Sequence, residues 1–510
     1  SKASTVSGAT MISRIFGFFR DVVIAQFFGA TMAADAFFVA YKIPNLLRRL
    51  LGEGALSTSF IPVYTEYLAT KGKDEARKLV RVIFGAFLAL FIVLTALGIV
   101  FAPQIVSVIA YGFTDQPEKF RLTVLLTRIM FPFLMAIGLG SITLGILNSW
   151  RMFFIPAVAP AMLSITEIVF IFALTPYLKV PITGLAFGVL LGGFLQFIFQ
   201  LVPVLKKYGS LMPKINLSHP GLRKIGRLMM PALIGVSVVQ INSFVDTICA
   251  TLLKAGSVTH LYYGNRLMQL PLAVFGTAVA TVTLPMMSEN AARKEFKSLK
   301  DTLSFSLRSM SFLIMPAAVG FIVFGGPIIR MLFERGKFLP ADTASTAWVL
   351  LFYSTGILFF AGVKVVASAF HSLQDTKTPV IVASVAMVFN VGLNLTVVFV
   401  EPVKVIFSSG GLALATAIAS AVNFLLLIII FRKRMGLIGG KTVTHSVVKH
   451  ISASFIMGAF LYYFSGMTAD WNIYARVPLV IIAGGLIYGL LSVLFRIPEL
   501  DSLKELFFKK

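Results

Sequence analysis

The stretch VIFGAFLALFIVLTALGIVFA, residues 82–102, decides the class of this chain. It runs for 21 residues without a charged side chain, and a helix needs about 20 apolar residues to cross the hydrocarbon core of a bilayer. The stretches 411–431 and 477–495 are likewise apolar and contain no charged side chain. Hydrophobic residues make up 57% of the 510 residues and charged residues only 13%. This composition is typical of a membrane protein and excludes a soluble enzyme.

The same length criterion, applied along the chain, predicts an all-α integral membrane protein with about fourteen transmembrane helices. The expected helices cover residues 7–29, 32–56, 78–102, 122–150, 155–176, 183–205, 225–253, 257–287, 304–333, 343–372, 378–400, 410–431, 443–465 and 474–495.

The net charge of +24 favours basic loops on the cytoplasmic side of a membrane over a nucleic-acid partner. Lysine and arginine concentrate in alternate connections, including 71–81, 206–227, 293–300 and 432–434. Because positive loops stay in the cytoplasm, we expect a multi-pass protein whose two termini are both cytoplasmic. The lone Cys249 excludes an internal disulfide.

The two halves of the sequence repeat each other. A shift of 223 residues places Pro62 on Pro285, Glu66 on Glu289 and Pro156 on Pro379. Chance matching is the alternative, because Gly and Pro are common in membrane helices. A six-helix repeat gives two pseudo-symmetric lobes with the same orientation in the membrane, and transporters of this design bind substrate between the lobes. We therefore expect an N-lobe at 1–205, an amphipathic cytoplasmic linker at 206–222, a C-lobe at 223–435, and a final helix pair with the C-terminal tail at 436–510.

Charged residues occur inside the expected membrane helices, mainly in the first two. Such residues are costly in lipid and usually face a bundle interior or a watery cavity that serves a substrate or an ion. Guanidinium groups match phosphate oxygens in bidentate geometry, so a cationic cavity predicts a phosphate or pyrophosphate guest. The candidate substrate-binding residues are Arg14, Arg20, Asp21, Asp35, Arg48, Arg49, Glu53 and Arg266.

The carboxylates of this set would orient the arginines. For Arg14, Lys42 and Arg49 the alternative is that the long side chain reaches a membrane surface.

A second group of polar residues lies in the other half of the chain. Asp246 is expected on one helix, Asn390 and Asn394 share a face of another, and Thr416 lies on a third. Oxygen ligands of this kind suit a small hard cation, which predicts a sodium ion or a proton as coupling ion. Hydrogen bonds between helices explain the same residues equally well.

The sequence has no Walker lysine loop, no His-Glu metal motif and no nucleophile elbow. We therefore expect a protein that is not an enzyme, that needs no cofactor and that does not use ATP directly.

Five segments carry a family resemblance: SRIFGFFRD at 13–21, DAFFVAYKIPNLLRR at 35–49, GEGA at 52–55, NRLMQLP at 265–271 and QDTKTP at 374–379. They resemble the bacterial MurJ (MviN) lipid II flippases of the multidrug/oligosaccharidyl-lipid/polysaccharide exporter superfamily. The resemblance extends over essentially the whole chain. Family members often have an acidic residue just before the arginine at 266, whereas this chain has Asn265.

The resemblance implies two six-helix lobes around a central cationic cavity, and a final helix pair beside a groove for the undecaprenyl tail. It implies lipid II as substrate, the pyrophosphate-linked disaccharide-peptide that bacteria need for peptidoglycan, cell-wall biogenesis and cell shape. The implied location is the bacterial inner membrane, and the implied partners are membrane lipids and the cell-wall synthesis machinery. It also implies functional roles for Arg14, Arg20, Arg48 and Arg266, and for Asp21, Asp35 and Glu53.

Three other functions remain open at this stage. The chain could flip another polyprenyl-pyrophosphate oligosaccharide, or export drugs, although drug exporters favour cationic guests and a cationic cavity repels them. A membrane-embedded glycosyltransferase or lipid phosphatase would need a catalytic carboxylate or histidine cluster near a surface loop, and the sequence offers none.

Overall fold

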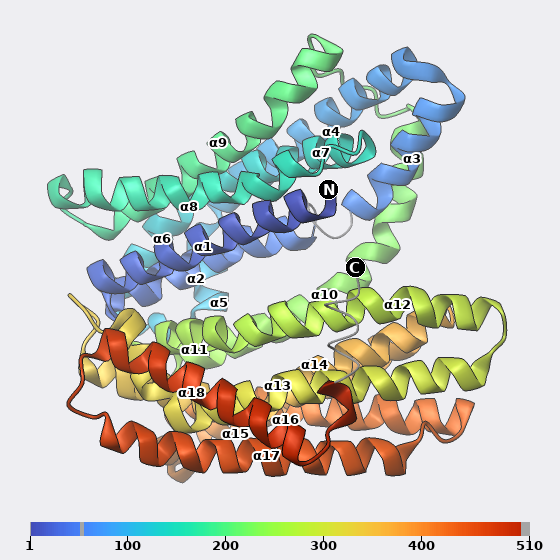
Figure 1. Ribbon diagram of the computed structural model, residues 1–510. Helices are drawn as coiled ribbons and strands as arrows, with labels where there is room; N and C mark the ends of the chain where they lie inside the picture. The colour runs from blue at the N-terminus through green and yellow to red at the C-terminus, as the bar shows by residue number, and fades with distance from the viewer. Residues whose placement is uncertain (1, 51–55, 501–510) are drawn as a thin grey trace. The chain divides into compact units, whose positions relative to one another are not determined.

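The computed structural model describes residues 2–50 and 56–500, and all regular structure in these ranges is helical. Figure 1 shows the helices as long rods. The first half of the chain forms α1 (Lys2–Phe28), α2 (Met32–Leu47), α3 (Ser57–Thr70), α4 (Gly72–Val100), α5 (Ala102–Ile109), α6 (Pro117–Met130), α7 (Phe133–Ser149), α8 (Phe154–Leu174), α9 (Ile182–Tyr208) and α10 (Pro220–Thr251). The second half forms α11 (Ser257–Pro271), α12 (Thr277–Ala292), α13 (Phe296–Phe333), α14 (Pro340–Ser372), α15 (Lys377–Phe399), α16 (Glu401–Met435), α17 (Gly440–Met467) and α18 (Ile473–Leu494).

Local sequence explains where several helices begin. Thr31 precedes α2, and its hydroxyl oxygen accepts a hydrogen bond from the backbone N–H of Ala34, which satisfies one of the free donors of the first turn. Proline occupies the first position of α6 and α10, where its missing N–H costs nothing. Asp375 caps α15, because its carboxylate accepts hydrogen bonds from the backbone N–H groups of Lys377 and Thr378.

Within the described ranges, ten helical stretches are long and apolar enough to cross a membrane. They confirm the prediction of a many-helix membrane protein, while the count of fourteen stays a prediction. The four expected spans that fall outside these ten are 7–29, 32–56, 225–253 and 257–287. These four contain the candidate residues of the cationic cavity and Asp246. Hydropathy is therefore weakest where the chain carries its intramembrane charges.

In three of the expected helices the regular α-helix is interrupted. The span 32–56 ends as an α-helix at Leu47 and continues as a π-helical turn at 48–50, after which 51–55 lie outside the described residues. The span 122–150 breaks between α6 and α7, where Pro132 lacks the N–H that a continuous helix needs. In 257–287 a π-helical turn at Leu272–Gly276 follows Pro271 and separates α11 from α12.

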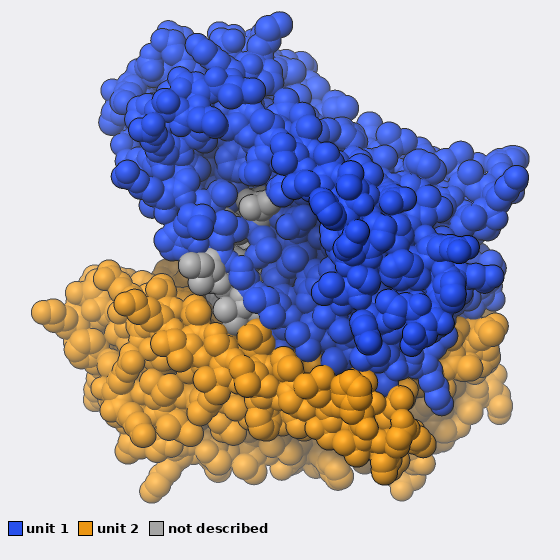
Figure 2. Space-filling view, turned by 180° about the vertical axis from the view of Figure 1, so that it is seen from behind, with its two compact units in different colours: residues 1–258, 335–338 blue, residues 259–334, 339–510 orange. Residues whose placement is uncertain are grey.

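The chain forms two compact units, coloured separately in Figure 2. Unit 1 contains residues 1–258 together with 335–338, and unit 2 contains 259–334 together with 339–510. In unit 1, α8 packs on α9 and α1, α7 packs on α9, and α2 packs on α6. In unit 2, α14 packs on α16 and α13, α15 packs on α16, and α17 packs on α13 and α18. The division lies after Val258, beyond the predicted linker, and the lobe boundaries proposed from the repeat stay a prediction.

The predicted linker region follows the surface of α4. After α9 ends at Tyr208, the backbone N–H of Lys214 donates to the carbonyl of Arg81 at 3.0 Å. The Arg77 guanidinium donates to the carbonyl of Ser210 at 2.9 Å. A Cβ atom on Gly85 would lie 2.5 Å from the Lys214 carbonyl oxygen. The missing side chain of this glycine therefore lets the linker backbone lie directly on α4.

Candidate functional site

Arg20 on α1 lies between two buried carboxylates. Its Nη2 donates to Asp21 Oδ1 at 2.7 Å, and its Nη1 donates to Glu167 Oε1 on α8 at 3.4 Å. The side chains of Asp21 and Glu167 are 0% and 2% exposed, and that of Arg20 is 11% exposed. Each buried carboxylate thus has a cationic partner, which a buried charge requires. The two acids also fix the guanidinium in one orientation.

Further arginines gather around Tyr41 on α2. The charges of Glu167, Arg48, Arg20 and Arg49 all act on its hydroxyl group. These residues come from α1, α8 and the end of α2, and the π-helical turn at 48–50 positions two of them. Arg48 is also held by its neighbour, because its Nε donates to Asn45 Oδ1 at 2.8 Å. The structure therefore brings three predicted arginines to one region of unit 1.

Lys42 connects this region to α10. Its ammonium group donates to the carbonyl oxygen of Ser243 at 2.6 Å and to the hydroxyl of Thr247. Asp246 and Arg49 both act electrostatically on it. We call the seven residues involved the unit 1 charge cluster: Arg20, Asp21, Lys42, Arg48, Arg49, Glu167 and Asp246. Four cations against three carboxylates leave it with a net positive charge, which suits an anionic guest.

Asp35 has a separate set of partners at the beginning of α2. Its Oδ2 accepts from Lys119 Nζ on α6 at 2.9 Å and from the backbone N–H of Gly256 at 2.7 Å. The ammonium group of Lys119 also lies 3.9 Å from the ring centroid of Phe113. The side chain of Lys119 is 2% exposed. Asp35 therefore joins α2, α6 and the turn after α10.

The remaining predicted substrate residues are placed as follows. Arg14 on α1 and Arg49 are exposed, and Arg266 on α11 is partly buried and belongs to unit 2. Glu53 lies outside the described residues. The structure thus groups Arg20, Asp21, Arg48 and Arg49, and the roles of all eight residues in binding stay predictions.

The residues of the predicted cation site are divided between the units. Asp246 belongs to unit 1, where Lys42 is its neighbour. Asn390 and Asn394 on α15 are fully buried in unit 2. Thr416 on α16 donates to the carbonyl of Leu412 at 2.9 Å. Among the residues that the structure describes, no group of three His, Cys, Asp or Glu side chains could hold a metal. The coupling-ion role of these residues stays a prediction.

Two residues of this region, one in the unit 1 charge cluster and one beside it, were not predicted from the sequence. Glu167 is a single acid in the apolar span 155–176, and Tyr41 is an uncharged residue beside the arginines. A search for isolated charges inside apolar spans would have found Glu167. Hydropathy averaged over the helix conceals it.

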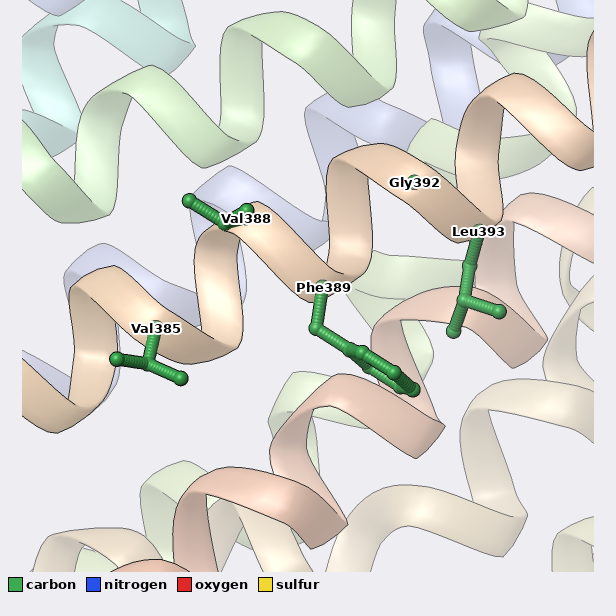
Figure 3. Close-up of a pocket in the computed structure, with 5 residues that line it drawn as sticks. All are labelled: Val385, Val388, Phe389, Gly392 and Leu393. Atoms are coloured by element: carbon green, nitrogen blue, oxygen red, sulfur yellow. The ribbon is translucent and has the colours of Figure 1, made fainter.

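An apolar pocket opens over α15 in unit 2 (Figure 3). It is lined by Val385, Val388, Phe389, Gly392 and Leu393. Because none of these side chains can bind a charged group, the pocket does not compete with the charge cluster as an anion site. Its lining suits hydrocarbon.

Comparison with known proteins agrees with this architecture. A family model described as lipid II flippase MurJ matches residues 24–482. The chain belongs to the MurJ family. A probable lipid II flippase MurJ of Vibrio cholerae is 40% identical over 430 residues, which cover 83% of this chain and 81% of the relative. The corresponding protein of Haemophilus influenzae is 35% identical over 506 residues, which cover 95% and 98%.

Solved structures give the same result for the fold. A lipid II flippase MurJ in an inward closed conformation aligns with a TM-score of 0.80 and 29% identity, covering 96% of this chain and 98% of that chain. An inward-facing multidrug resistance MATE family transporter of the MOP superfamily aligns with a TM-score of 0.69 and 16% identity, covering 86% of this chain and 99% of that chain. The second likeness concerns the fold alone. The MurJ-like architecture expected from the sequence is confirmed.

Proposed function

We propose that this MurJ family member moves lipid II from the cytoplasmic to the outer leaflet of the bacterial inner membrane. Its relatives are named as lipid II flippases at identities of 35% to 40%. The observation that carries the proposal is the arrangement of Arg20, which is held between two buried acids and acts on the Tyr41 hydroxyl together with Arg48 and Arg49. Oriented guanidinium groups in a low-dielectric site bind a pyrophosphate more strongly than they would in water.

The proposed mechanism is alternating access. The arginines of unit 1, together with Arg266, capture the pyrophosphate while the lipid tail stays among apolar helices, and the lobes then expose the headgroup outside. No bond is made or broken, so the protein is a transporter and not an enzyme. An inside-negative potential favours the return of an empty cationic site, since moving one charge through 100 mV is worth about 2.3 kcal/mol.

The coupling ion is part of the proposal. Asp246, Asn390, Asn394 and Thr416 would bind sodium with oxygen ligands, and a proton on Asp246 is the alternative. If Asp246→Ala leaves transport and its dependence on sodium and pH unchanged, this assignment is wrong. The topology with both termini inside rests on the basic connections described above, and contact with the cell-wall synthesis machinery rests on the substrate alone.

Depletion in a bacterium tests the substrate. The chain is supplied from a repressible promoter to cells that lack their own flippase, and lipid-linked precursors on the outer face are then labelled. We expect lipid II to disappear from the outer face and to accumulate inside. If a different polyprenyl-linked oligosaccharide disappears from the outer face while lipid II is unchanged, that oligosaccharide is the substrate and lipid II is not.

A further inference from the structure

A group of buried ionisable residues lies in unit 2, where the end of the described chain folds back. After α18 the chain turns at Arg496, which adopts a left-handed φ of 47°. Ile497 then enters the apolar core that contains Phe312, Met457 and Tyr488. Glu499 follows and is 1% exposed. We call residues 496–500 the C-terminal hook.

The carboxylate of Glu499 contacts α13 and α17. Its Oε1 accepts from Arg308 Nη1 on α13 at 2.5 Å and from the Ser446 hydroxyl on α17 at 3.1 Å. Its Oε2 lies 3.3 Å from His450 Nε2, also on α17. His450 is 0% exposed. A carboxylate buried in this way needs its partners, because an unpaired charge in the interior is costly.

The hydrogen atoms around His450 can be counted. The Ser311 hydroxyl oxygen lies 2.8 Å from the Arg308 carbonyl oxygen and 2.8 Å from His450 Nδ1. A serine hydroxyl has one hydrogen to donate. If Ser311 donates to the carbonyl and Glu499 is ionised, His450 must donate from Nδ1 to Ser311 and from Nε2 to Glu499, so the imidazole carries two hydrogens and a positive charge. If Ser311 instead donates to Nδ1, the imidazole is neutral.

The two arrangements differ by one proton and by the rotation of the Ser311 hydroxyl group. In the charged arrangement the Glu499 carboxylate faces two cations, Arg308 and His450. In the neutral arrangement it faces Arg308 alone. The other titratable group at this place among the described residues is Tyr488 of α18, whose hydroxyl donates to the Phe312 carbonyl at 2.8 Å. We propose that His450, Glu499, Arg308 and Ser311 form a proton-binding site, and that the bound proton fastens the C-terminal hook to α13 and α17.

This site belongs to unit 2 and shares no residue with the unit 1 charge cluster. Histidine is the side chain that most often serves as a proton switch in proteins. The direction follows from the charges: a rise in pH removes the proton from His450, takes away one charge-assisted hydrogen bond and loosens the hook. The hook thus lies against the last helix pair, because α17 packs on both α13 and α18.

Hydrogen exchange of the hook amides tests the proposal. The purified full chain in detergent is exchanged between about pH 5.5 and about pH 8.5, on either side of the ordinary histidine pKa of about 6.5. Each rate is divided by the intrinsic rate at that pH. We expect about tenfold less protection at the upper end, the factor that one weak charge-assisted hydrogen bond supplies. Equal protection at both ends would overturn the proposal.

His450→Gln is the decisive variant, because glutamine fills the space and cannot gain a charge. We expect it to remove the pH dependence. His445→Gln is the matched control, since His445 lies on the same helix but is exposed, and it should keep the pH dependence. A response that survives in His450→Gln, or that disappears in His445→Gln, would contradict the assignment.

Ser311→Ala separates proton binding from simple packing and serves if His450→Gln does not fold. It removes the partner of Nδ1 in both arrangements, but the bond lost by the charged imidazole is charge-assisted and therefore stronger, so the charged form is weakened more than the neutral form. The midpoint of the exchange transition should therefore move to lower pH. A merely structural role would lower protection without moving the midpoint, and that result would overturn the proposal.

Discussion

Lys119 Nζ lies 2.9 Å from Asp35 Oδ2, and the two side chains are 2% and 1% exposed. Removing either partner leaves the other as a buried charge, which costs about 3 kcal/mol or more. We expect Asp35→Asn and Lys119→Met each to lower the free energy of unfolding by about 3 kcal/mol, measured by unfolding in detergent. In the double variant no charge is left unpaired, so its loss should be clearly smaller than the sum of the two single losses. Additive losses would show that the pair is not coupled.

Arg20→Lys tests the geometry of the guanidinium. Lysine keeps the positive charge but donates from a single nitrogen, without the planar fork of separate nitrogens that contacts Asp21 and Glu167. We expect transport of lipid II into the outer leaflet to fall at least about tenfold, the factor that corresponds to the loss of about 1.4 kcal/mol of binding. Arg293→Lys is the control, because Arg293 forms an exposed pair with Glu289. Equal activity of the two variants would mean that charge alone suffices at position 20.

Glu167→Gln tests the acid that the sequence reading missed. Glutamine retains the shape but leaves Arg20 with one charged partner in place of two. We expect lower stability, and weaker transport because the guanidinium is less well oriented. Glu66→Gln is a suitable control, since Glu66 is about half exposed and pairs with Lys224; exposed pairs contribute little. Unchanged transport and stability in Glu167→Gln would remove this residue from the site.

Asp375 gives a prediction with a defined pH dependence. Burial opposes ionisation of its carboxyl, but hydrogen bonds from Thr378 and Arg434 lower its pKa to about 2. A carboxylate with a lowered pKa stabilises the folded state above its ordinary pKa of about 4, and this contribution is lost as the pH falls toward 2. Asp375→Ala should therefore cost about 1 kcal/mol near neutral pH, as for other helix caps. The difference from wild type should shrink below about pH 4; a difference that persists there would contradict the cap.

The apolar part of this architecture could be predicted from sequence because spans such as 82–102 carry their own evidence. Burial of a long apolar helix in a bilayer depends on its composition more than on its neighbours. The helices that contain charged residues were harder to predict. In the helix expected at 32–56 the regular α-helix gives way after Leu47 to a π-helical turn at 48–50, and a hydrophobic pattern does not predict such a turn.

The candidate site could be predicted only in part. The arginines were visible as costly residues in apolar surroundings. Their partners were not, because Glu167 is 147 residues from Arg20 and Lys119 is 84 residues from Asp35. The pairing depends on how α1 packs on α8 and α2 on α6. The network around Glu499 was missed for a further reason: a single acid after the last helix has no sequence signature.

The central claim is that the arginines of unit 1 bind an anionic headgroup during its passage across the membrane. Translocation of labelled lipid II by purified Arg48→Ala in proteoliposomes tests it most directly, beside wild type and Arg293→Ala at equal protein content. We predict that Arg48→Ala folds normally, judged by its elution and thermal unfolding, yet moves no lipid II, while Arg293→Ala behaves as wild type. Translocation by Arg48→Ala at the wild-type rate would contradict the account.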